Sequence, residues 1–516
     1  MSISLIIYAA VTFAVLFPAD EHQLHGEDRP ICVIRMEVRL ADDVAQPFGS
    51  MFEMLDAAGH PIAGAYVPES SSLFHRSEGR RAVFFVEPAE SESVKLERLG
   101  RPFPNKPAGT LYTLQDRLFA VVRPQLDSET REFKDGQWIP VPEGCELSQE
   151  GFAWALPIQG QLMTASHRGV SWGNTLVFAP EPNDAAKYFY YYSGGKLLAY
   201  RYGDTDSGVQ SQVLAFRWSP GEPTVDRTKA FLTETLPIDY PLCFGSIGDR
   251  LVFATNSTKR VYSIGPSGMD CIYEHRGTES WQGYVMVRYR GRLLIGQYPQ
   301  GQCYSTDGRV VERWGPDLPL TSAWSWELQS MGFLRGQLLA GVWPWGQVFK
   351  FDGKRWSLWS RAFTAPPVAD EECPYWQECS AANIERNAWG QRINSIVTFQ
   401  GSTFLSTMNK GGNAETTEII GERAQEYGMV ARCPAHNQLD WALRWKSKTS
   451  FVFRIWQGRA EVEQDGELVA SGIGSFGRVT ELNRVKWGEG VAGEICGLIS
   501  TAQIEVHGRT NAALDK

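Results

Sequence analysis

The sequence lacks the short motifs that would name a metal, nucleotide or serine-hydrolase site. Its nine cysteines include no C-x-x-C pair, which argues against a zinc ribbon or zinc finger of the usual ligand spacing. No H-E-x-x-H, G-x-S-x-G or P-loop motif occurs in the 516 residues. The sequence therefore points to no particular cofactor, and the cofactor stays unknown.

Positive charge and long apolar runs are also scarce. Lys and Arg total 50 against 59 Asp and Glu, a net charge of −9 that argues against nucleic acid as a general partner. The apolar run at 5–17 is too short to span a bilayer but suits a signal peptide. We expect a signal peptide at 1–25, no membrane span in the mature chain, and a secreted or periplasmic protein. Because no Lys or Arg precedes the run, a mis-assigned start or a buried strand is the alternative.

Two cysteines lie close together in a long irregular stretch. Cys373 and Cys379 are separated by five residues, between a proline-rich segment and the aromatic stretch around Trp389. An exported protein could join them in a local disulfide, and two free thiols are the alternative.

Glycine and aromatic residues are abundant, and they recur with a fixed period. The chain holds 50 Gly, 18 Trp and 18 Tyr, which suits many short strands joined by tight turns. Segments 290–308 and 335–353 align without gaps at an offset of 45 residues. A repeat of this length is typical of β-propeller blades.

Fainter copies of the same turn and strand extend the repeat along the chain. Their opening turns stand at Gln115, Gln159, Gly194, Gly248 and Gln400. Each turn separates two apolar runs, as in a β-hairpin, and Asp-Gly pairs at 135, 307 and 352 predict a second hairpin in three copies.

The repeats predict an all-β fold built on a seven-bladed β-propeller over 81–421, with eight blades as the alternative. Strands from the N-terminal side, between 81 and 97, could complete the last blade and so remove an open sheet edge.

The sequence texture changes after about residue 421. Alternating segments at 449–455, 460–469 and 497–506 predict a small C-terminal β-sandwich-like module over 422–510. The closing stretch, 493–506, resembles the last strands of laminin-G or concanavalin-like modules. An N-terminal β segment at 33–80 either adds strands to this module or forms a cap of its own.

The turn assignment divides a propeller into two faces, and one face gathers aromatic and cationic residues. Flat aromatic rings stack on sugars, and Arg and Lys pair with carboxylates, so this face suggests an acidic polysaccharide or other glycan. The alternative is that the Trp residues pack between blades and the Arg residues form a solvated rim. The candidate substrate-binding residues are Arg168, Arg201, Tyr298, Trp343, Trp345, Trp389, Arg392 and Lys410.

His167, Tyr190 and Tyr202, together with Arg201, resemble the His, Tyr and Arg set of propeller polysaccharide lyases. The resemblance is one of residue types and architecture, without a matched family motif. It implies β-elimination, in which His or Tyr removes a proton and Tyr protonates the leaving oxygen.

Two other functions stay open at this stage. A glycoside hydrolase would use paired carboxylates, with Asp204 and Glu327 as candidates. A non-catalytic propeller that binds glycan or protein would need neither set. Whether the protein is an enzyme is therefore undecided.

Overall fold

A computed structural model describes residues 29–72, 76–77, 80–88, 95–104, 106, 109–122, 129–141, 152–166, 168–181, 184, 186–205, 208–320, 325–369, 371–410 and 418–507. The expected signal peptide at 1–25 and the candidate catalytic residue His167 lie outside these residues. The fold is all-β, as the sequence predicts, and consists of antiparallel sheets of four to six strands.

Seven sheets follow one another along the described chain, and each is built on four antiparallel strands. The first sheet consists of β8 (Thr110–Leu114), β9 (Arg117–Val121), β10 (Thr130–Lys134) and β11 (Gln137–Pro140), and the second of β12 (Phe152–Ile158), β13 (Gln161–Ser166), β14 (Gly169–Trp172) and β15 (Thr175–Phe178). The third sheet consists of β16 (Lys187–Ser193), β17 (Lys196–Thr205), β18 (Gly208–Arg217) and β19 (Leu232–Pro237), and the fourth of β20 (Pro241–Ile247), β21 (Arg250–Thr255), β22 (Arg260–Gly265) and β23 (Gly268–Glu274).

The other three sheets continue the same pattern. The fifth sheet consists of β24 (Gln282–Tyr289), β25 (Arg292–Tyr298), β26 (Cys303–Thr306) and β27 (Val311–Arg313), and is extended by β4 (Ser70–Ser72) and β5 (Arg76–Ser77). The sixth consists of β28 (Glu327–Leu334), β29 (Gln337–Trp343), β30 (Gln347–Phe351) and β31 (Trp356–Arg361), and the seventh of β32 (Arg392–Phe399), β33 (Ser402–Met408), β34 (Val430–Pro434) and β7 (Glu97–Arg98).

The first strands of successive sheets pack against each other. β8 contacts β12, β16 contacts β20, and the series continues through β24 and β28 to β32, which contacts β8 again. Between β12 and β16, the Trp154 indole N–H donates to the Tyr190 carbonyl at 3.0 Å. This succession, in which the last sheet returns to the first, is propeller-like.

The seven predicted hairpins are confirmed, because each turn lies between the first two strands of a sheet. The turn residues Arg290 and Gly291 have φ of 46° and 75°, and Arg335 and Gly336 have φ of 49° and 72°. Two successive positive φ values are typical of a type I′ turn, which Gly at the second position permits. The 45-residue period thus reports a repeated hairpin.

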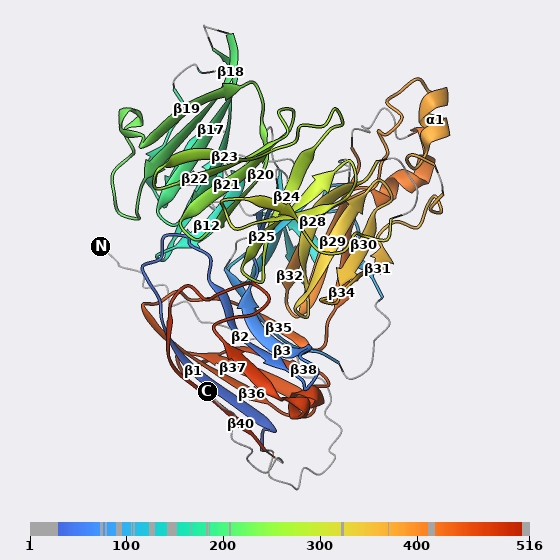
Figure 1. Cartoon of the computed structure of the whole chain (residues 1–516). Helices are drawn as coiled ribbons and strands as arrows, with labels where there is room; N and C mark the ends of the chain where they lie inside the picture. Colours follow the sequence, from blue (N-terminus) through green and yellow to red (C-terminus); the bar gives the residue numbers. More distant parts are fainter. Residues whose placement is uncertain are drawn as a thin grey trace, which may run out of the picture.

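Strands from both ends of the described chain form the second part of the molecule. One five-stranded sheet has the order β38-β37-β36-β1-β40, and the other has the order β35-β6-β3-β2-β39. Figure 1 shows these blue and red strands together below the seven sheets. The strands are β1 (Cys32–Arg39), β2 (Gly49–Leu55), β3 (Pro61–Val67), β6 (Arg81–Val86), β35 (Gln438–Ala442), β36 (Lys448–Ile455), β37 (Arg459–Gln464), β38 (Glu467–Ile473), β39 (Arg484–Trp487) and β40 (Leu498–Val506).

Strand pairing differs from the sequence prediction at both ends of the predicted propeller, 81–421. β6 pairs with β3 and β35, so residues 81–86 lie with the N- and C-terminal strands and not with the repeats. β34 lies beyond residue 421 but pairs with β33 and β7. The first predicted boundary lies before β6 and the second before β34, and neither agrees with the sheets. Pairing between distant segments cannot be seen in the local composition from which the boundaries were predicted.

The two five-stranded sheets share one hydrophobic core, and the part of the molecule that they form docks on the first hairpin turns of several of the seven sheets. The core includes Phe52, Phe84 and Phe453, which are buried. The Asp440 carboxylate accepts hydrogen bonds from the backbone N–H of Gln400 at 3.1 Å and from that of Gly401. This docking leaves the opposite ends of the seven sheets free of the sandwich strands (Figure 1).

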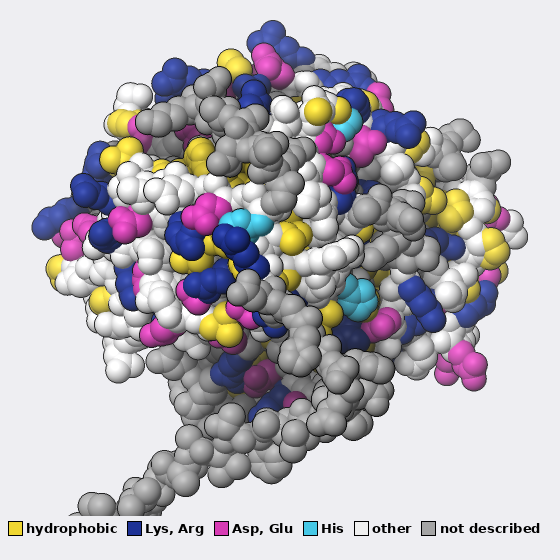
Figure 2. All heavy atoms as spheres, turned by 90° about the horizontal axis from the view of Figure 1, so that it is seen from below, with side chains coloured by type: hydrophobic (Ala, Val, Ile, Leu, Met, Phe, Trp, Pro, Cys, Tyr) yellow, Lys and Arg dark blue, Asp and Glu magenta, His cyan; other side chains and the backbone are white. Residues whose placement is uncertain are grey.

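Helix is limited to short pieces in the described residues. These are α1 (Trp376–Ala381), η1 (Arg227–Lys229), η3 (Gly421–Glu426) and η4 (Gly477–Glu481). None of the helices in the described ranges is long and apolar enough to cross a membrane. Seen from the sandwich end, Figure 2 shows Lys and Arg side chains interspersed with Asp and Glu.

The Cys373–Cys379 disulfide that the sequence allows is not formed. Both thiols are free and buried. Cys379 lies on α1 within a hydrophobic cluster that contains Trp389 and Tyr427, so apolar packing holds this stretch in place.

Candidate functional site

The site is formed where the first strand of a sheet begins and the second ends, away from the sandwich. In the sheet of β28 and β29, Glu327 is paired with Trp343. In the preceding sheet Gln282 is paired with Tyr298 at the same position. In the following sheet Arg392 takes the position of Glu327. The repeat thus brings equivalent positions of neighbouring sheets to one level.

A register shift follows each of these first positions, two residues further on. It places Tyr284, Gln329 and Asn394 opposite no single partner in the neighbouring strand. A β-bulge of this kind re-aims a side chain and often stands beside a functional site. The Asn394 side-chain amide donates to the Gly109 carbonyl at 2.8 Å and so links β32 to the first sheet.

An ion pair between two sheets lies at the centre of the site. Arg392 donates to a carboxylate oxygen of Glu327 at 3.0 Å, and the two side chains are only 6% and 3% exposed. Burial raises the pKa of Glu327, while Arg392, Lys410 and the Tyr284 hydroxyl act in the opposite direction. The pair therefore places a carboxyl group and a guanidinium in a largely water-excluded setting.

Aromatic rings from several sheets surround this pair. The Tyr298 ring lies 6.3 Å from the Tyr284 ring and 6.3 Å from the Trp343 ring, measured between centroids. The Tyr202 and Tyr240 rings lie 5.7 Å apart on the neighbouring sheets. Burial raises the pKa of Tyr240, which is also within electrostatic range of the ion pair. These rings supply flat apolar surface beside buried charge.

Lys410 lies at the edge of the site, next to an acidic partner. Its ammonium group is 3.2 Å from a carboxylate oxygen of Glu385, and both side chains are partly exposed. Close by, Gly390 packs against the Trp343 indole, since a Cβ at Gly390 would stand 2.0 Å from Trp343 Nε1. The glycine therefore fixes how closely the 386–391 segment approaches the Trp343 ring.

Several buried polar atoms of the site have no hydrogen-bond partner among the described protein atoms. Buried polar groups are almost always paired with protein, water or ligand. The unpaired set contains both acceptors and donors, so a partner must offer both. The atoms are Glu327 Oε1, Gln329 Oε1, Asn394 Oδ1, Arg392 Nε and Trp343 Nε1.

The structure brings together five of the candidate catalytic and substrate-binding residues that the sequence nominates. Arg392 belongs to the buried ion pair, Tyr298 and Trp343 lie beside it, and Lys410 acts on it electrostatically. Tyr202 stands against Tyr240 on the adjacent sheet.

Two further candidates lie in the sheet of β16 and β17, within a separate set of contacts. Arg201 holds Asp184 at 2.7 Å, and the Tyr188 hydroxyl donates to the same carboxylate. Tyr190 is a buried core ring stacked on Tyr188, and burial raises the pKa of its phenol far above the ordinary value. A phenol so deeply buried in the core is poorly placed to exchange protons with a ligand.

The remaining three candidates are dispersed. Arg168 is exposed in the turn between β13 and β14. Trp345 is buried beneath the Arg361 guanidinium. Trp389 is fully buried and meets the Tyr427 ring at 5.0 Å in the core, as the packing alternative expects.

The sequence nominates Glu327 only as one of two candidate carboxylates of a glycoside hydrolase. It does not nominate Tyr284, Gln329 or Tyr240 as site residues. A signal for two of the missed residues was present, because the 45-residue offset pairs Tyr284 with Gln329. The bulge that aims them cannot be read from one sequence, since it depends on the pairing of two strands.

No group of three or more His, Cys, Asp or Glu side chains within the described ranges could hold a metal ion. The site offers polar hydrogen-bonding groups, aromatic faces and two cations paired with carboxylates.

Comparisons with known proteins place few limits on the function. No family model matches the chain, and no curated protein matches it. Among solved structures, apo AztD from Citrobacter koseri is 9% identical, with a TM-score of 0.28 and coverage of 86% of this chain and 99% of that one. The extracellular domain of BT4673 from B. thetaiotaomicron is 10% identical, with a TM-score of 0.24 and coverage of 85% and 74%.

Proposed function

We propose that this chain is an exported seven-bladed β-propeller that binds a glycan at the open ends of its fifth to seventh sheets. The contact between β32 and β8 supports a closed ring of seven blades. The short apolar run at 5–17 supports export. The glycan proposal rests on the site itself.

The observation that carries the proposal is the set of unpaired buried donors and acceptors beside aromatic rings. A sugar offers hydroxyl groups that both donate and accept, and its ring faces stack on aromatic side chains. Glu327 Oε1 and Trp343 Nε1 need opposite partners, and a polyhydroxylated ligand supplies both. The Tyr298 ring next to Trp343 provides the stacking surface.

An acidic polysaccharide is the form of this ligand that we favour. Arg392 is neutralised by buried Glu327, so it is poorly placed to contact a ligand carboxylate. The pair of Lys410 and Glu385 is partly exposed, and a uronate carboxylate could replace Glu385 there. On this proposal Glu385→Gln strengthens binding of an acidic glycan and leaves binding of a neutral glycan unchanged.

Glycoside hydrolysis is a second candidate, and a specific observation favours it. Glu327 is a buried carboxyl group whose pKa is raised, as a general acid requires near neutral pH. β-Elimination is supported by less, because of its two candidate catalytic residues in the described ranges, Tyr190 and Tyr202, only Tyr202 contacts an aromatic ring of the site.

The experiment is a binding and turnover assay on a panel of neutral, uronic and sulfated polysaccharides. Calorimetry measures binding, new reducing ends mark hydrolysis, and ultraviolet absorbance of an unsaturated uronate marks elimination. Trp343→Phe removes the Nε1 donor and should weaken binding. Trp356→Phe is the matched control, since Trp356 lies in the same sheet and is equally buried, with 4% exposure. Equal effects of the two substitutions, or no binding to any glycan, would refute the proposal.

A further inference from the structure

A cavity lies between the sandwich and the hairpin turns, at the opposite end of the same sheets from the glycan site. Its volume is about 600 Å³, within the range of pockets that hold small molecules. Three turns form one wall, those between β24 and β25, β28 and β29, and β30 and β31. Strand β3, the residue that follows β6 and the short helix η4 form the other wall.

The cavity concentrates positive charge in a protein that is acidic overall. Two acidic side chains, Glu87 and Asp352, also line it, and Glu53 pairs with Arg290 from outside the lining. The basic side chains that line it are Arg290, Arg335, Lys354, Arg355 and Arg478, and His60 lies among them. Arg290 and Arg478 already contact carboxylates, so a bound anion adds charge compensation mainly at Lys354, which meets His60.

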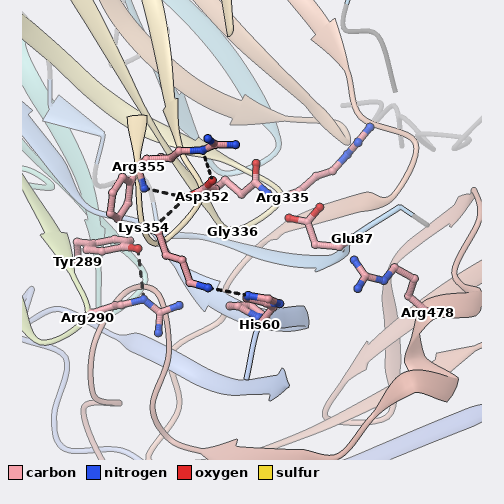
Figure 3. A pocket seen from close by; sticks show the side chains of 14 residues that line it. His60, Glu87, Tyr289, Arg290, Arg335, Gly336, Asp352, Lys354, Arg355 and Arg478 are labelled. Atoms are coloured by element: carbon pink, nitrogen blue, oxygen red, sulfur yellow. Dashed lines mark hydrogen bonds and ion pairs between the residues drawn. The ribbon is translucent and has the colours of Figure 1, made fainter. Parts of the chain in front are cut away.

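The basic groups lie on two sides of the cavity. Figure 3 shows Glu87 between Arg335 and Arg478, and Lys354 reaching across to His60. The Lys354 ammonium is 3.4 Å from His60 Nε2. Its neighbour there is an imidazole and not a carboxylate. Arg478 contacts two carboxylates, Glu481 at 3.1 Å and Asp56 at 3.8 Å.

Apolar ring surface completes the lining. Tyr289 and Phe351 both line the cavity, and their ring centroids are 6.3 Å apart. A site with basic groups on two sides and an aromatic wall suits an organic anion of small size more than a bare ion.

We propose that this cavity binds a small organic molecule through an oxyanion, either a carboxylate or a phosphate. Lys354 contacts the oxyanion from the repeat side, and Arg478 contacts it from the sandwich side. The bound anion then joins the two parts of the molecule. This inference is independent of the glycan site, since no residue is shared.

The test is calorimetric titration of the full chain with glucuronate and, separately, with inorganic phosphate. Sodium chloride at matched ionic strength is the control for screening. We expect saturable binding of at least one of the two anions. Glucuronate alone indicates a carboxylate ligand, and phosphate alone indicates a phosphorylated one.

Variants on the two walls separate a built site from general charge attraction. Lys354→Gln and Arg478→Gln should each weaken binding by about tenfold, which corresponds to about 1.4 kcal/mol. Arg309→Gln is the matched control, because the Asp307 turn repeats the Asp352 turn and Asp307 accepts from the Arg309 N–H at 2.8 Å. Arg309 is exposed and does not line the cavity.

Three results would overturn the inference. They are the absence of saturable binding with both anions, equal weakening by Arg309→Gln, and equal displacement by chloride. Because the variant side chains lie on exposed turns or at a partly exposed helix, unfolding is readily excluded by circular dichroism. Trp343→Phe must leave anion binding unchanged, so a failure here is distinct from a failure of the glycan proposal.

Discussion

Replacing Arg392 by Met tests the buried ion pair most directly. The Arg392 side chain is 6% exposed and its Glu327 partner is 3% exposed, so the substitution leaves a carboxylate buried without its cation. Removing one partner of such a pair costs about 3–5 kcal/mol. The carboxyl group escapes part of this penalty by taking up a proton.

Protonation limits the penalty in a way that depends on pH. Neutralising a carboxyl group of ordinary pKa costs about 3.7 kcal/mol at pH 7 and about 1 kcal/mol at pH 5. We therefore expect Arg392→Met to lower the free energy of unfolding by about 3–4 kcal/mol at pH 7 and by much less at pH 5. In the wild type Arg392 lowers the pKa of Glu327 against the effect of burial, so its removal raises that pKa further. A raised folded-state pKa favours folding at low pH and loses that effect as pH rises, which gives the sign of the difference.

Urea-induced unfolding at the two pH values, followed by tryptophan fluorescence, measures this difference. Arg260→Met is the control, since Arg260 holds Glu274 at 2.6 Å on the exposed surface and its loss should barely move the midpoint. A loss of the same size at both pH values would refute the reasoning. A loss below about 1 kcal/mol at pH 7 would refute it as well.

Three further predictions concern docking, packing and pH. Asp440→Ala leaves buried Arg81 without its buried carboxylate partner and should cost about 3–5 kcal/mol, measured by urea unfolding and by faster proteolysis of the sandwich. Gly390→Ala places a Cβ against Trp343, so it should cost about 1–3 kcal/mol and weaken glycan binding in calorimetry. Burial raises the pKa of Glu87 to about 7, so its contribution to stability should fall as pH rises from about 4.5 to 7, and Glu87→Gln should remove about 3 kcal/mol of that dependence.

Each of these predictions has a matched control or a contrary result. Asp116 also pairs with Arg81 but is 78% exposed, and Asp116→Ala should have little effect. Gly458 has open space at its Cβ position, and Gly458→Ala should leave glycan binding intact. Identical pH profiles for the wild type and Glu87→Gln would show that this carboxyl group titrates normally.

The sequence alone predicts the hairpins well, and the reason is local. The turn residues of the 290 and 335 repeats determine a positive φ and a change of direction within a few residues. Apolar runs on either side then pair with each other because they are close along the chain. The strands at 449–455 and 497–506 are predicted for the same reason.

Tertiary structure alone decides which distant segments meet. β1 pairs with β36 and β40, and β7 pairs with β34, although hundreds of residues separate the partners. The same holds for the site. Glu327 and Arg392 are 65 residues apart and reach each other only because neighbouring sheets stack in order. Local sequence determines a strand and its turn, whereas the partner of a buried charge is determined by packing between sheets.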